Sequence, residues 1–327
     1  MTAGLLAVVL CAAVLAGTAA GPWLLRHASP FLVRMPRLAV LVIAGGLGLW
    51  LVALLAIGPV LAWAAAGPAL LPEGAADVCR RCLSAANPFP GQAASGPVPA
   101  VLLLAPTAAL TLVVGAGLLR SLLRADAQAR SAAGVLLPGA QHRWVQGHDV
   151  TVVEAERPFA LTLPARRGGI VLSTAALHAL ADDELAAVLA HEDAHLRQRH
   201  HLVSALVDGL AAPLLWVPVV RAAVDALPHY LEIAADDRAR RSVGTPALVG
   251  ALLKLGERGH PATALPSGRV VLQAAGPERI RHLVRPVGGW AGALPAGALA
   301  GYLVGMAALS AAVHLPYAAA ALSGCGL

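Results

Sequence analysis

Long apolar segments divide this chain of 327 residues. Charged residues are absent from about 2–25, 38–68, 98–119 and 295–327. Each segment is long enough to cross a bilayer core, which takes about 20 apolar residues in a helix. The first segment lacks the basic start of a signal peptide, which favours an uncleaved span. The pattern therefore predicts four transmembrane helices, three before a large polar region and one after it.

Within the polar region, short β-branched or alternating runs precede a helical pattern. Val150–Val153, Phe159–Leu163 and Gly169–Leu172 have the pattern of strands. They predict a small antiparallel sheet, followed by a helix from Glu184 to about His201. An exposed edge strand there can bind a peptide by strand addition, although a sheet that only packs against the helix fits equally well. The expected fold is a mostly α membrane protein with an α+β domain.

Composition agrees with a membrane protein. The chain is 58% hydrophobic and 13% charged, with a mean hydropathy of +0.71, whereas soluble domains carry about 25% charged residues. The net charge of +6 comes almost entirely from arginine, since Lys254 is the one lysine. No arginine cluster is interleaved with aromatic residues, so direct nucleic-acid binding is not expected. The partners expected are the lipid bilayer and a protein substrate.

The arginines predict the orientation. Arg26, Arg34 and Arg37 lie in the short connection after the first apolar segment, and short basic connections face the cytoplasm. The N-terminus, a loop at about 67–97 and the C-terminus would then lie outside the cell membrane. The predicted division is three spans in 1–120, a cytoplasmic domain in 121–294, and the fourth span with a short tail in 295–327.

Two cysteines lie in the predicted outer loop. Cys79 and Cys82 form a single C-x-x-C pair, together with Arg80 and Arg81, which count mildly against the outside placement. Such a pair is compatible with a disulfide in an oxidising compartment and with two free thiols. The sequence leaves both open.

The strongest chemical pattern is His191-Glu192-Asp193-Ala194-His195. Histidines four residues apart share one face of a helix, so both imidazoles can bind one zinc ion. Glu192, beside the first histidine, is then the general base that activates water. The pattern predicts a zinc-dependent peptidase.

A later acidic pair supplies the remaining expected site residues. Glu232 is predicted as the third metal ligand, and Asp236, one helical turn later, as the acceptor for a ring N–H of a ligand histidine. The alternative is a solvated acidic helix face. The apolar stretch 202–220, which contains Asp208, lies between the histidines and Glu232. If it crossed the membrane, the ligands would be separated, so it is expected to be buried, re-entrant or interfacial.

Other histidines have weaker interpretations. His200 and His201 are expected to end the metal helix, where a basic residue suits the negative end of the dipole. His229 or Tyr230 is a candidate for stabilising the oxyanion of a tetrahedral intermediate.

The motif and its surroundings resemble the BlaR/MecR-type integral-membrane zinc metallopeptidases, in a short form without a sensor domain. The resemblance is carried by Ala187–Leu196, by Arg199-His200-His201, by Pro158-Phe159-Ala160, and by Glu232 to Asp237. It implies a gluzincin-like domain that uses Zn²⁺ to cleave a cytoplasmic protein, namely a transcriptional repressor, in signal transduction. No β-lactam sensing is expected from it.

Two alternatives remain. One is an HtpX-like protease of membrane-protein quality control, which is similar in its ligands. The other is a non-catalytic receptor or scaffold with a structural metal site. Structural zinc sites are usually closed by four protein ligands. The sequence offers three, which favours catalysis.

Overall fold

Four long apolar helices make up much of the described structure. The computed structural model describes residues 3–65, 73–87, 100–258 and 289–322. Four helices in these ranges are long and apolar enough to cross a membrane, which confirms the predicted number and fits a multi-pass membrane protein. They are α1 (Ala3–Leu32), α2 (Pro36–Ala65), α4 (Ala100–Leu136) and α11 (Ala293–Leu322).

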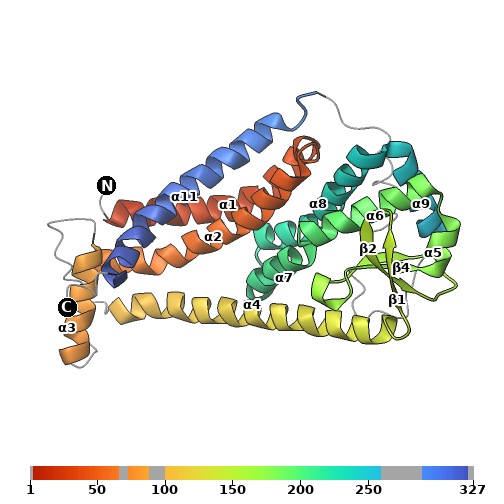
Figure 1. Ribbon diagram of the computed structural model, residues 1–327. Helices are drawn as coiled ribbons and strands as arrows, with labels where there is room; N and C mark the ends of the chain where they lie inside the picture. Colours follow the sequence, from red (N-terminus) through yellow and green to blue (C-terminus); the bar gives the residue numbers. More distant parts are fainter. Residues whose placement is uncertain (1–2, 66–72, 88–99, 259–288, 323–327) are drawn as a thin grey trace.

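Three of these helices pack closely. α1 and α2 are joined by a tight turn at 33–35, and α11 runs along both (Figure 1). The Tyr302 hydroxyl of α11 donates a hydrogen bond to the Ala13 carbonyl of α1 at 3.0 Å. Gly17 lies beneath this tyrosine, where a Cβ would collide with the hydroxyl group. A small residue therefore permits the close approach of the two helices.

The two ends of the bundle differ. The start of α1, the short helix α3 (Glu73–Ala86) and the end of α11 lie at one end, and the sheet lies at the other (Figure 1). Cys82 of α3 is disulfide-bonded and Cys11 is a free thiol. The side chain of Cys79 and residue Cys325 fall outside the described part, as do 66–72 and 88–99 of the predicted outer loop.

α4 links the bundle to the polar domain. Its 37 residues correspond to about 55 Å of helix, and its last turns cover one face of the sheet (Figure 1). Ala132 of α4 is buried there with Val153, Leu163 and Val171. Asp126 of α4 also pairs with two arginines of the 3₁₀ turn η1 (Ala165–Arg167). The sheet is thus attached directly to a candidate spanning helix.

The sheet has four strands and is mixed. The strands are β1 (Gln141–Val145), β2 (His148–Val153), β3 (Ala160–Thr162) and β4 (Ile170–Ser173), in the order β1-β2-β4-β3. β1–β2 and β3–β4 are antiparallel, but β2 and β4 are parallel. The expectation of an antiparallel sheet is therefore wrong, and β1 was missed. Parallel pairing needs a crossover, which the segment carrying β3 provides, so β3 becomes an outer strand.

The other face of the sheet packs against helices. Val150, Leu172 and Leu189 are fully buried between the sheet and α6 (Asp182–Arg197). α5 (Thr174–Ala179) and α9 (Thr245–Arg258) complete this layer. Residues 259–288 of the predicted 121–294 domain lie outside the described part.

The helix that carries His191 and His195 ends earlier than predicted. α6 ends at Arg197, Arg199 adopts a left-handed conformation with φ of 51°, and a new helix, α7 (His200–Ala211), begins. The prediction of one helix to His201 is therefore wrong, and His200 and His201 begin a helix instead of ending one. A left-handed residue breaks the helical hydrogen-bond pattern and redirects the chain.

The apolar stretch 202–220 folds back on itself. α7 leads through the 3₁₀ turn η2 (Ala212–Leu214) into α8 (Pro218–Val243). The two helices form a hairpin that packs against α1, α2 and α4 (Figure 1). The chain therefore returns to α6 before it reaches Glu232.

Candidate metal centre

α6 and α8 bring three predicted ligands together. Ligand atoms of His191, His195 and Glu232 all lie within 4.8 Å of one another. The Nε2 atoms of the two histidines are 3.0 Å apart. His191 Nε2 and His195 Nε2 lie 3.6 and 3.5 Å from oxygens of the Glu232 carboxylate, so one metal ion can bind all three groups. Among the described residues, no fourth His, Cys, Asp or Glu joins this group.

Asp236 lies behind His191. Its Oδ1 is 3.0 Å from His191 Nδ1, and the residue is 2% exposed. Since Glu232 and Asp236 are one turn apart on α8, both face α6. This is the geometry of a carboxylate that accepts the ring N–H and so directs Nε2 toward a metal. Asp236 therefore contacts the His191 nitrogen opposite Nε2.

Glu192 faces the edge of the sheet. The Thr162 hydroxyl of β3 donates to Glu192 Oε2 at 2.6 Å and also lies 3.0 Å from the Glu192 carbonyl oxygen. Thr162 is not among the site residues predicted from the sequence. Alternation along the strand was the available signal, because Leu161 and Leu163 pack beneath α4 and Thr162 must then face the opposite side.

His200 lies behind His195. The Nδ1 atoms of His195 and His200 are 2.8 Å apart, and His200 Nε2 is 3.4 Å from Gln198 Oε1. Burial, together with the neighbouring His195 ring, lowers the pKa of His200 to about 3. The expectation of a basic His200 at a helix C-terminus is therefore wrong. It is a neutral, buried ring at the start of α7.

Tyr230 does not face this centre as an oxyanion donor would. It is 4% exposed and belongs to the core that α8 shares with the membrane helices. Its hydroxyl lies beside Ser29 of α1, and burial raises the pKa of this hydroxyl. The neighbouring His229 is exposed. Tyr230 thus serves to join α8 to α1.

The donor set fits a divalent metal ion such as zinc. Two imidazole nitrogens and a carboxylate oxygen converge, which is the composition of catalytic zinc sites. The opposite nitrogen of each histidine faces an acceptor, Asp236 or His200, which fixes the tautomer that ligation requires. Glu192 follows His191 directly in α6 and is 9% exposed, so it is the candidate general base.

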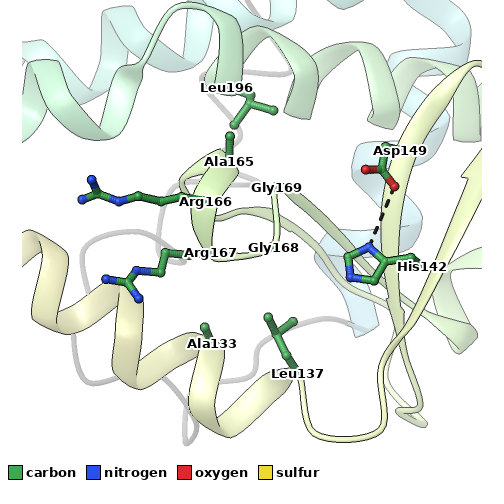
Figure 2. Close-up of a pocket in the computed structure, with 10 residues that line it drawn as sticks. All are labelled: Ala133, Leu137, His142, Asp149, Ala165, Arg166, Arg167, Gly168, Gly169 and Leu196. Carbon is green, nitrogen blue, oxygen red and sulfur yellow. Dashed lines mark ion pairs between the residues drawn. The ribbon is translucent and has the colours of Figure 1, made fainter.

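A separate cavity adjoins the centre. It has a volume of about 560 Å³ and lies between the end of α4, the β1–β2 hairpin and η1 (Figure 2). Leu196, directly after His195, lines it, but none of the candidate ligands or Glu192 does. His142 and Asp149 form an exposed pair at 3.9 Å on its wall.

Comparison with known proteins finds a family match over part of the chain. The family model of peptidase family M48 matches residues 129–230, a range that contains His191, Glu192 and His195 and ends two residues before Glu232. The match supports a membrane-type metallopeptidase, which is a metal-dependent class. It does not confirm the BlaR/MecR-type assignment. Searches of the curated proteins and of the solved structures find no match.

Proposed function

We propose that this protein is an integral-membrane, zinc-dependent endopeptidase. The observation that carries the proposal is the convergence of His191, His195 and Glu232, with Glu192 directly after His191 in the chain. Three ligands leave a coordination position for water, whereas a structural zinc site is usually closed by a fourth protein ligand. This favours catalysis over the receptor or scaffold alternative.

Each side chain has a role in peptide hydrolysis. When bound, zinc supplies Lewis-acid polarisation of the attacking water and of the scissile carbonyl. Glu192 accepts the proton of the water as its oxygen attacks the carbonyl carbon, and then delivers that proton to the leaving amine as the C–N bond breaks. Thr162 donates a hydrogen bond to Oε2 of Glu192 and so holds this carboxylate in position. Asp236 and His200 orient the two histidines.

The substrate is proposed to pair with β3. This strand is an outer strand of the sheet, and its Thr162 contacts the general base. A peptide added beside β3 would lie alongside Glu192 in extended form, because main-chain groups of an outer strand can pair with another strand. The sheet then has a binding role in addition to its packing role.

The catalytic domain is proposed to be cytoplasmic, with both termini outside. The basic connection around Arg34 joins α1 to α2 at the end of the bundle that carries the sheet (Figure 1), and basic connections favour the cytoplasm. The disulfide-bonded Cys82 lies in α3 at the opposite end, and disulfides persist in oxidising compartments.

The activity is tested by sequencing new protein N-termini in cells that express the protein. Cells with the native chain should show cleavage products that are absent with Glu192→Ala, while purified Glu192→Ala keeps its zinc. Glu156→Ala, at an exposed glutamate, is the matched control and should behave as the native chain. Identical N-termini with and without Glu192 would refute hydrolysis by this centre.

The same comparison addresses the substrate. Cleavage of a transcriptional repressor in signal transduction rests on the BlaR/MecR-type resemblance. A DNA-binding repressor that accumulates uncut in the Glu192→Ala strain would support that role. Accumulation of misfolded membrane proteins instead would support quality control.

A further inference from the structure

The turn between α7 and α8 exposes large apolar side chains. Trp216 is 81% exposed and Leu215 is 47% exposed. They lie in the twelve residues between Asp208 and Arg221, which contain no charge. We propose that this tip, Leu215–Trp216, is inserted into the lipid of the leaflet on the zinc-centre side, so that α7 and α8 form a re-entrant hairpin.

Contacts with α4 set the depth of α7. The Ser121 hydroxyl donates to the Ala205 carbonyl at 2.8 Å. One turn further, a Cβ on Gly117 would lie 2.8 Å from the Gly209 carbonyl oxygen. Because residue numbers fall on α4 as they rise on α7, the helices are antiparallel. The tip, beyond Gly209, therefore lies on the membrane side of Gly117.

Contacts with α1 set the same depth for α8. Val219 of α8 lies against Gly21 of α1, and the Tyr230 hydroxyl lies beside Ser29, so these two helices run parallel. Val219 is thus level with a residue five positions before Arg26. At 1.5 Å per residue, the tip lies roughly 10 Å to the membrane side of Arg26 on α1 and of Arg120 on α4.

The surroundings of the tip favour lipid over another protein. Leu112 and Val113 of α4, at a comparable depth, are 74% and 52% exposed, so the tip continues the apolar surface of a candidate spanning helix. Arg221 is the first charge after the tip and forms an exposed pair with Asp225. A tryptophan next to such a boundary suits the interfacial region of a bilayer.

Insertion would hold the metal centre near the membrane surface. α7 begins at His200, five residues after His195, and α8 carries Glu232. Both arms of the hairpin therefore lead directly to candidate ligands. The inference is independent of the proposed peptidase activity, because it concerns only where the hairpin lies.

Photolabelling from lipid tests the placement. The full-length protein is reconstituted in phosphatidylcholine vesicles containing a phosphatidylcholine with a diazirine in its acyl chain, irradiated, and digested with trypsin. Label is expected at Leu215 and Trp216 in the peptide 200–221, and at Leu112 and Val113 as positive controls. Trp144, exposed to 75% on β1, is the matched control and should remain unlabelled.

Label on Leu112 and Val113 without label on 209–218 would overturn the proposal. This result is also the one expected if a second copy of the chain or another protein covers the tip. The labelling measures neither zinc binding nor proteolysis. A failure of the peptidase proposal would therefore leave the labelling result unchanged.

Discussion

His195 and His200 face each other through their Nδ1 atoms, which lie 2.8 Å apart. If His195 binds a metal through Nε2, its proton resides on Nδ1, so His200 Nδ1 must accept it. The proton of His200 is then on Nε2, which faces Gln198 Oε1 at 3.4 Å. His200 thus accepts the Nδ1 proton of His195, as Asp236 accepts that of His191.

Removal of the acceptor at His200 should weaken zinc binding. His200→Leu is expected to lower zinc affinity about 10- to 100-fold, the usual cost of losing such a partner, and Asp236→Ala should act similarly. His200→Asn places an acceptor oxygen near the position of Nδ1 and should retain most of the affinity. Chelator competition on the purified protein measures this, with His178→Leu, at an exposed histidine, as control. Equal affinities of the Leu and Asn variants would contradict the role.

Thr162 should affect turnover more than binding. Thr162→Val keeps the shape and β-branching but loses the hydroxyl that contacts Glu192 Oε2. We expect kcat on a peptide taken from an identified cleavage site to fall about tenfold with little change in KM, because only the placement of the base changes. Thr162→Ser should restore most of kcat. A change in KM alone, or no rescue by serine, would indicate that Thr162 supports only the strand.

Two glycines of α4 offer a matched pair for the contact with α7. A Cβ on Gly117 would lie 2.8 Å from the Gly209 carbonyl oxygen, whereas a Cβ on Gly115 meets nothing within 4 Å. Gly117→Ala should therefore destabilise the protein by about 1–3 kcal/mol, as overpacking does. Gly115→Ala should not. Thermal unfolding in detergent measures both, and equal midpoints would mean that the two helices are not in tight contact.

The pair Glu184–Lys254 should make stability depend on pH. Burial opposes ionisation of Glu184, but Lys254 Nζ at 2.5 Å and the Ala181 N–H at 2.8 Å outweigh it and lower the pKa of Glu184. A folded pKa below the unfolded value gives stability that is present above about pH 4.5 and is lost as pH falls through the folded pKa.

Lys254→Met should reduce this contribution. Since Lys254 is 42% exposed, the loss near pH 7 should be modest, about 0.5 kcal/mol. The difference between native and variant unfolding midpoints should shrink as pH drops below 4.5. Glu184 of the native chain then becomes protonated, so its charge no longer pairs with Lys254. A difference that stays constant from pH 7 to pH 3 would show that the pair does not act through charge.

The sequence by itself determined the four apolar segments and the histidine pair. Both depend on short-range periodicity: about 20 apolar residues cross a bilayer, and residues four apart share a helix face. The relation of Glu232 to Asp236 follows from the same spacing, because both residues lie on one face of α8, toward α6.

Only the tertiary structure decided how separate segments meet. A single left-handed residue, Arg199, ends α6 and turns His200 back onto His195, and no periodicity predicts it. The parallel pairing of β2 with β4 makes β3 an outer strand and brings Thr162 to Glu192. The turn η2 between α7 and α8 directs an apolar stretch back toward α6. These relations depend on packing between distant residues, which a linear pattern of hydrophobic and polar positions does not specify.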